Sequence, residues 1–269
     1  MKKTGNSLIW IGGAITLLMT ALIVLGYFWT PYDPNAMDAA AKFQPPSAAH
    51  LLGTDNFGRD IFSRVMDGAG TTFFIALCVV AIGTAAGVVI GSLCGWFGRL
   101  PDLILTRICD AITAFPSFLL ALVVVTIAGS GTYNIILALG VLFIPSFARI
   151  VRGEFARCRE LNYIKSARLM GAGSFRIMFR HILPNIWYVL LSAITIGFNN
   201  AVLSEASMSF LGIGIQPPDA SLGSMLSDSQ TYLKSAPWYA IGTGCTIILL
   251  ILGFSLLTEG LQRSSQKAS

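Results

Sequence analysis

The chain has 269 residues, of which 54% are hydrophobic and only 12% are charged. A soluble domain carries roughly twice that share of charged residues, so the composition excludes an ordinary soluble enzyme. Several apolar runs are longer than the roughly 18 residues that indicate a membrane-spanning helix. They are too continuous for the alternating strands of a membrane β-barrel. The sequence therefore predicts an all-α, polytopic membrane protein with six transmembrane helices.

The first predicted span covers residues 8–28 and follows two basic residues, Lys2 and Lys3. A secretory signal peptide begins in the same way, but its apolar region has only about 7–15 residues. The longer run favours an uncleaved anchor helix. Trp29 and Tyr32 are then expected at the far membrane interface, where aromatic side chains are enriched.

A polar outer segment follows over residues 31–70 and includes the sequence HLLGTDNFGRDIFSR. We expect Thr54 or Asp55 to cap a short helix there, and Asp60 to pair with Arg64 one helical turn later. The apolar residues of that helix suit a position along the membrane surface. Candidate functional residues of this outer motif are Gly53, Thr54, Asp55, Gly58, Arg59 and Asp60. The alternative is that they belong to a capped interfacial helix that makes no contact with a substrate.

The second and third spans are expected over residues 72–96 and 103–128. The second is rich in glycine and alanine, which allow helices to approach closely. In the third, Pro116 should bend the helix. Arg107 and Asp110 lie three residues apart and are expected to pair near one membrane edge. Such a pair is usually structural. The alternative is control of a gate, for which Pro116 is a further candidate.

The remaining spans are expected over residues 133–150, 186–211 and 238–257. The fifth span contains Asn199, Asn200 and Glu205, which are candidates for a translocation path. A carboxylate inside a span is costly unless it faces a cavity or a partner, which makes Glu205 a candidate functional residue. The equal alternative is that Glu205 is solvated at the outer interface or pairs with a neighbouring helix.

Between the fourth and fifth spans lies the longest polar interval of the chain, residues 149–185. It holds eight of the eighteen basic residues: Arg149, Arg152, Arg157, Arg159, Lys165, Arg168, Arg176 and Arg180. Its pattern predicts two short helices separated at residues 171–173, with Ser174 as the N-cap of the second and Pro184 at its end. One interpretation is a solvated basic loop, which is common on the cytoplasmic side. The other is a surface for a cytoplasmic partner.

With six spans, all but four of the eighteen Lys and Arg residues fall on the side that carries both termini. The four on the other side are Lys42, Arg59, Arg64 and Lys234. Positive residues concentrate in the cytoplasmic segments of membrane proteins, so both termini are predicted to be cytoplasmic. The same distribution accounts for the net charge of +5 without nucleic acid as a partner.

The 149–185 loop also carries a family resemblance. The order Lys165-Ser166-Ala167, Gly171 and Ile182-Leu183-Pro184 resembles the EAA loop of the membrane subunits of ATP-binding-cassette (ABC) importers. The residues that match are Ala167, Gly171, Leu183 and Pro184, and those that depart from the pattern are Lys165 and Ser166. In that family the loop docks on a cytoplasmic ATPase, and Gly171 and Gly173 would permit its sharp turn because glycine tolerates positive φ.

Two further stretches resemble the dipeptide, oligopeptide and nickel branch of these importers, in its second-permease type. They are the outer motif and LSEASMSFLGIGIQPP, residues 203–218. The resemblance implies a fold like that of type I ABC importer permeases. An N-terminal anchor helix, an outer loop and an interfacial helix would occupy residues 1–70. A permease core with five spans would occupy residues 71–269.

The resemblance further implies a multi-pass subunit in a prokaryotic cell membrane that forms half of a path for peptides, or for a related solute such as nickel or a metal chelate. Its partners would be a homologous second permease, two cytoplasmic ATPase subunits and an extracytoplasmic solute-binding protein. No Gly is followed by Lys anywhere, so the chain has no phosphate-binding loop, and ATP would be bound by the partners. No catalytic cluster, metal motif or cofactor is predicted. The alternative is a secondary transporter or channel without an ATPase, although no internal repeat supports it.

Overall fold

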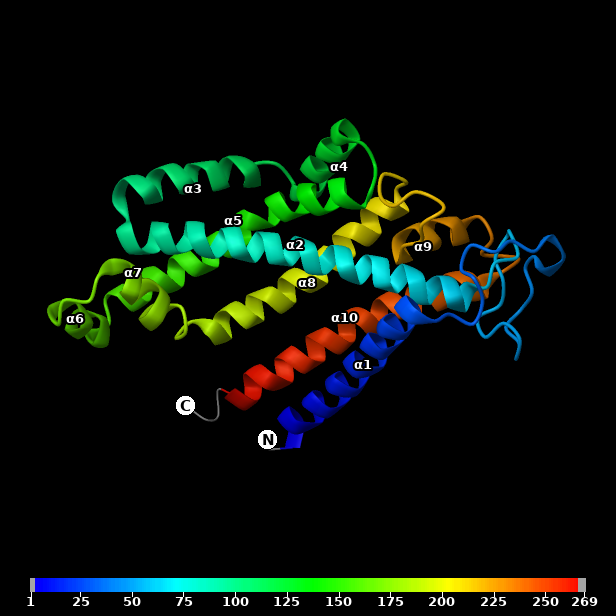
Figure 1. Ribbon diagram of the computed structural model, residues 1–269, viewed down its shortest axis with the longest axis horizontal. Helices are drawn as coiled ribbons and strands as arrows, with labels where there is room; N and C mark the ends of the chain where they lie inside the picture. The colour runs from blue at the N-terminus through cyan, green and yellow to red at the C-terminus, as the bar shows by residue number, and fades with distance from the viewer. Residues whose placement is uncertain (1–2, 266–269) are drawn as a thin grey trace. The chain divides into compact units, whose positions relative to one another are not determined.

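The computed structural model describes residues 3–265, and these residues are almost entirely helical (Figure 1). The helices are α1 (Lys3–Phe28), η1 (Ala39–Ala41), α2 (Ile61–Phe97), α3 (Arg99–Thr113), α4 (Ser117–Ala128), α5 (Thr132–Arg159), α6 (Asn162–Leu169), α7 (Ser174–Arg176), η2 (Ile177–Ile182), α8 (Trp187–Phe210), α9 (Leu222–Gln230) and α10 (Pro237–Ser265). In this part of the chain, β pairing is limited to an isolated bridge between Thr54 and Asp60. The all-α class is confirmed. Lys2 and Lys267, which entered the charge count, lie outside the described residues.

Five of the described helices are long and apolar enough to cross a membrane: α1, α2, α5, α8 and α10. α3 and α4 pass the same test only as a pair, and they meet at an angle of 83°. Pro116 lies in the break, where its ring and its missing backbone N–H disfavour a continuous helix. The count is therefore five spans, or six if the bent pair is one span. The cytoplasmic orientation of the termini stays a prediction.

α2 is longer than the sequence pattern predicts. The expected interfacial helix and the second span form one helix of 37 residues, Ile61–Phe97. Gly68 lies inside this helix and allows it to pack closely on residue Ser221. A Cβ added at Gly68 would lie 3.2 Å from the carbonyl carbon of Ser221. Tertiary contact here outweighs the weak helix propensity of glycine. The predicted break near residue 70 is wrong.

The contacts within the chain divide it into two compact units. Unit 1 comprises Met1–Leu77, Val125–Ile135 and Asn199–Ser269, and unit 2 comprises Cys78–Val124 and Ile136–Phe198. In unit 1, α1 lies along α10 (Figure 1). The first turn of α9 also packs tightly on α8, since a Cβ at Gly223 would lie 2.3 Å from the carbonyl oxygen of Ala206.

In unit 2, α2 and α5 pack with their backbones in close approach. Four glycines recur every four residues along one face of α2: Gly83, Gly87, Gly91 and Gly95. A Cβ at Gly91 would lie 2.5 Å from the carbonyl oxygen of Ala148, so any larger residue would separate the two helices. Beyond these glycines, an apolar cluster that includes Trp96 and Phe155 joins this contact to the segment between α5 and α8.

Candidate functional site

The segment between α5 and α8, residues 160–186, is called the α5–α8 loop below. Its first helix, α6, ends in a Schellman motif at Gly171, whose φ is +82°. The N–H of Ala172 donates to the carbonyl of Ala167 at 3.1 Å, and the N–H of Gly171 donates to that of Arg168 at 3.0 Å. The turn predicted at residues 171–173 is therefore present. Gly171 provides the positive φ, whereas Gly173 has an ordinary φ of −68°.

The second helical part of the loop begins at Ser174 and widens into the π-helix η2. Ser174 was expected to be the N-cap, but the cap residue is Gly173, which has no side chain that could bond to the helix. At the other end, the N–H of Leu183 donates to the carbonyl of Met178 at 2.9 Å, which is the five-residue spacing of a π-helix. Pro184 then removes a backbone donor, and the chain turns into α8 at Trp187.

One face of the loop is buried in an apolar cluster within unit 2. From the loop it contains Ile164, Ala167, Ile177, Met178, Ile182 and Ile186, and from α2, α5 and α8 it contains Trp96, Val151, Phe155, Cys158 and Leu190. Because so many large side chains are buried, the loop is a folded, packed element rather than a fully solvated loop.

The opposite face exposes four large apolar side chains, called the exposed apolar residues below. They are Leu169 (90% exposed), Met170 (81%), Phe175 (65%) and Phe179 (45%). The rings of Phe175 and Phe179 stack in parallel with their centroids 6.5 Å apart. Lys165 and Ser166 are exposed on the same loop, as is Pro184, whereas Ala167 is buried and Leu183 is half-buried.

Polar contacts join the loop to α2 and join its two ends to each other. The guanidinium of Arg168 lies over the ring of Trp96 at 4.9 Å, and Arg159 donates to the carbonyl of Trp96 at 3.2 Å. Asn185 donates to the hydroxyl of Tyr163 at 3.2 Å. Burial raises the pKa of the Tyr163 phenol, so it remains neutral at physiological pH.

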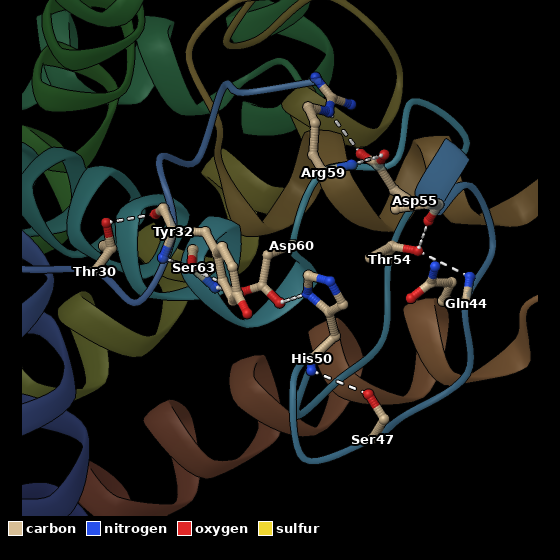
Figure 2. Close-up of polar contacts among 11 residues, drawn as sticks. Thr30, Tyr32, Gln44, Ser47, His50, Thr54, Asp55, Arg59, Asp60 and Ser63 are labelled. Carbon is tan, nitrogen blue, oxygen red and sulfur yellow. Dashed lines mark hydrogen bonds and ion pairs between the residues drawn. The ribbon is translucent and has the colours of Figure 1, made fainter. Parts of the chain in front are cut away.

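The outer motif lies in the N-terminal loop, residues 29–60, and its polar side chains are buried. Figure 2 shows their polar contacts. Asp55 accepts hydrogen bonds from the backbone N–H of Phe57 at 2.8 Å and of Arg59 at 3.0 Å. Its other oxygen pairs with Nε of Arg59 at 2.6 Å. Thr54 donates to the carbonyl of Ala41 and accepts from the backbone N–H of Gln44. These bonds fold the loop upon itself.

Asp60, rather than Thr54 or Asp55, caps the following helix. Its Oδ2 accepts from the N–H of Ser63 at 2.8 Å and from the Ser63 hydroxyl at 2.7 Å. Its Oδ1 lies 2.9 Å from Nδ1 of His50 (Figure 2). The predicted pair with Arg64 is absent, because Arg64 donates instead to the carbonyl of Pro34 at 3.0 Å.

Gly53 and Gly58 of the same motif have φ of +74° and +76°. A Cβ at Gly58 would lie only 1.8 Å from the carbonyl oxygen of Asp38, so no other residue fits without moving the loop. The motif therefore consists of residues that determine the conformation of the loop.

The gate and path candidates differ in their immediate surroundings. Glu205 is fully buried and accepts a hydrogen bond from Ser209 at 2.7 Å, which contradicts the alternative of a solvated carboxylate, and its role in a translocation path stays a prediction. Asn199 donates to Ser255 at 2.7 Å, whereas Asn200 is exposed. Pro116 is exposed in the bend between α3 and α4.

Ion pairs in unit 2 differ from the predicted one. Asp110 lies 3.8 Å from Arg149 rather than pairing with Arg107. Asp102 forms a two-point pair with Arg152, at 2.5 Å and 2.8 Å. The two partners of this pair are 50 residues apart, and no local spacing signals such a contact. Across residues 3–265, no group of three or more His, Cys, Asp or Glu side chains is arranged to hold a metal.

Comparison with known proteins gives the class of this protein. Residues 87–267 match the family described as the inner membrane component of binding-protein-dependent transport systems. The chain belongs to this family. The resemblance to ABC importer membrane subunits is thereby confirmed.

Relatives within the family place the chain more closely. A putative peptide transport system permease of Brucella suis is 40% identical over 252 residues, covering 94% of this chain and 85% of that protein. The glutathione transport permease GsiD of Pectobacterium atrosepticum is 39% identical, covering 93% and 83%. The dipeptide transport permease DppC of Haemophilus influenzae is 37% identical, covering 93% and 87%.

A solved structure supports the fold. A chain of the inward-facing MetNI methionine ABC transporter matches with a TM-score of 0.61 at 17% identity, covering 74% of this chain and 95% of that chain. The chain therefore has the fold of a type I ABC importer permease. It is a permease component of such a transport system.

Proposed function

We propose that this permease forms half of a translocation path for peptides and that its α5–α8 loop docks on a cytoplasmic ATPase. In this proposal a homologous second permease supplies the other half, and two ATPase subunits bind and hydrolyse ATP. A solute-binding protein delivers the substrate from the far side of the membrane. The peptide substrate is supported by relatives at 37–40% identity that are named as peptide and dipeptide transport permeases.

The observation that carries the docking proposal is the two-sided packing of the loop. Its inner face is buried in the unit 2 cluster, while Leu169, Met170, Phe175 and Phe179 are exposed. Exposed apolar side chains held on a rigid frame are typical of protein interfaces. The frame lowers the entropy cost of binding, because the backbone is already ordered.

The basic residues of the loop suit a partner of opposite charge. Lys165, Arg176 and Arg180 are exposed near the exposed apolar residues in the sequence. Such charges speed association with an acidic groove and fix its register. Residues 165–184 would then carry both the apolar and the basic part of the contact.

The proposal is tested by co-purifying the permease pair with its cognate ABC ATPase subunits. Phe175→Ser combined with Phe179→Ser should abolish retention of the ATPase while leaving the amount of membrane-inserted permease unchanged. Leu233→Ser, at a site 52% exposed outside the predicted spans, is the matched control and should retain the ATPase.

Transport by reconstituted complexes provides the second measurement. Uptake of a labelled dipeptide into proteoliposomes should require ATP and the solute-binding protein, and it should be lost in the double Phe variant. Uptake that continues without ATP would favour the secondary transporter. Full ATPase retention by the double variant would disprove docking through this face.

A further inference from the structure

The α5–α8 loop is joined by the chain to α5 and α8, but it reaches α2 only through noncovalent contacts. The end of α2 lies in the same apolar cluster as α6 and η2. Trp96, one residue before the end of α2, is only 6% exposed. Trp96 and its neighbours therefore join the loop to this end of α2.

Two arginines hold Trp96 from different elements. Arg168, on α6, places its guanidinium 4.9 Å from the centre of the indole ring. Arg159, the last residue of α5, donates to the main-chain carbonyl of Trp96 at 3.2 Å. That carbonyl belongs to the last turn of α2, where carbonyl groups lack partners within the helix and a positive charge is favourable.

The indole ring of Trp96 also packs against apolar side chains of α6. It packs in one cluster with Ile164 and Ala167 of α6, on the face opposite to the exposed apolar residues. Trp96 thus touches the inner face of the helix whose outer end leads to Leu169 and Met170. The cation–π attraction requires the guanidinium of Arg168 to stay over the face of the ring, so it opposes a sideways movement of α6 relative to Trp96.

We propose that Trp96, held by Arg168 and Arg159, is the positioning residue through which the α5–α8 loop moves the end of α2 during transport. This inference rests on the proposed function of the loop as an ATPase-docking element. The α2–α5 contact at Gly91 already joins those two helices. The Trp96 contact adds a direct connection from α6 to α2, so that the loop and both helices move as one body.

The test compares Arg168→Gln, Arg168→Lys, Trp96→Leu and the Trp96→Leu/Arg168→Gln double variant in the full reconstituted complex. Three quantities are measured for each: retention of the ATPase, its rate of ATP hydrolysis, and labelled dipeptide taken up per ATP hydrolysed. Arg157→Gln is the matched control, because it removes an exposed arginine that pairs across one helical turn, with Glu154 at 2.5 Å.

Arg168→Gln should retain the ATPase and hydrolyse ATP normally, but its uptake per ATP should fall about two- to fivefold, the weight of a partly exposed cation–π contact. Arg168→Lys should restore uptake, because a lysine ammonium also binds an aromatic face. Uptake per ATP in the double variant should be no lower than in the more impaired of the two single variants, because both substitutions remove the same contact. Arg157→Gln should match the unmodified complex.

Normal uptake per ATP in both Arg168→Gln and Trp96→Leu would overturn the inference while leaving ATPase docking intact. Loss of ATPase retention by Arg168→Gln would also overturn it, because Arg168 would then belong to the docking contact itself. The Arg168 variants keep the test decisive if Trp96→Leu does not fold. An unmodified complex that binds no ATPase would instead refute the proposed function, and this inference with it.

Discussion

The N-terminal loop and the α5–α8 loop both lie outside the predicted spans, yet different forces hold them in shape. In the N-terminal loop, charged and polar side chains are buried: Asp55 is fully buried and Arg59 is 5% exposed. In the α5–α8 loop, apolar side chains form the interior, and others of the same kind, such as Phe175, remain exposed. Polarity alone therefore does not indicate which side chains outside the spans are available to a partner.

The difference has a physical basis. A buried polar network stabilises only if each group has a partner, so it fixes one conformation of the backbone. An apolar cluster places fewer demands on direction and leaves the far side of its helices free for another protein. The first arrangement suits a fixed structural element, and the second suits a surface that binds and transmits movement.

The largest effect is expected in the buried ion pair of the N-terminal loop. Asp55→Asn keeps the shape of the side chain but leaves the buried Arg59 without a carboxylate partner. The free energy of unfolding should fall by about 3–5 kcal/mol. Thermal unfolding in detergent measures this change. Asp33→Asn, at an exposed site, is the control and should change the same quantity by less than about 0.5 kcal/mol. Equal losses in both variants would contradict the importance of burial.

Removing apolar volume should be nearly as costly in the α5–α8 loop. Ile182 is fully buried in the cluster, so Ile182→Ala should lower the free energy of unfolding by about 2–5 kcal/mol. Leu169→Ala removes a similar side chain that is 90% exposed, and its effect should stay within about 0.5 kcal/mol. If the two variants had the same melting temperature, the assignment of inner and outer faces to this loop would be wrong.

Two glycines with nearly the same φ provide a matched pair across the two loops. Gly58 has φ +76° and Gly171 has φ +82°, but a Cβ would meet the Asp38 carbonyl at 1.8 Å only in the first. Gly171→Ala should cost about 1 kcal/mol, from backbone strain alone. Gly58→Ala should cost about 1–3 kcal/mol more, because the overpacked loop has to move. Similar melting temperatures would show that the N-terminal loop is softer than its contacts indicate.

A small change in stability should accompany a large change in transport in the last comparison. Gly171→Asp adds a charged side chain to open space beside the exposed apolar residues, so folding should suffer by only about 1 kcal/mol. ATP-dependent uptake should nevertheless be lost, since the added side chain alters the docking face. Gly153→Asp adds the same charge at an open, exposed position on α5 and should keep uptake. Normal uptake by Gly171→Asp would contradict the docking proposal.

The sequence predicted the features that depend on local chemistry. Long apolar runs located the spans, Gly171 marked the turn after α6, and Pro116 marked the bend between α3 and α4. Each of these follows from the residue itself, through its solvation or its allowed backbone angles.

The contacts that the sequence did not predict depend on folding at a distance. His50 reaches Asp60 only after the N-terminal loop folds on itself, and the Asp102–Arg152 pair requires two separate helices to meet. Trp96 was assigned simply to the end of a span, because its arginine partners lie more than 60 residues away. No periodicity within a helix encodes such contacts.

The π-helix Ile177–Ile182 makes the number of residues between Gly171 and Pro184 as important as their identity. Its wide turn accommodates one residue more than an α-helix of the same rise would hold. A further residue inserted before Ile182, which the wide turn could not also absorb, would rotate the residues beyond it by about 100° and turn Ile182 away from the buried cluster. Natural variants of this permease should therefore differ in composition along this segment long before they differ in its length.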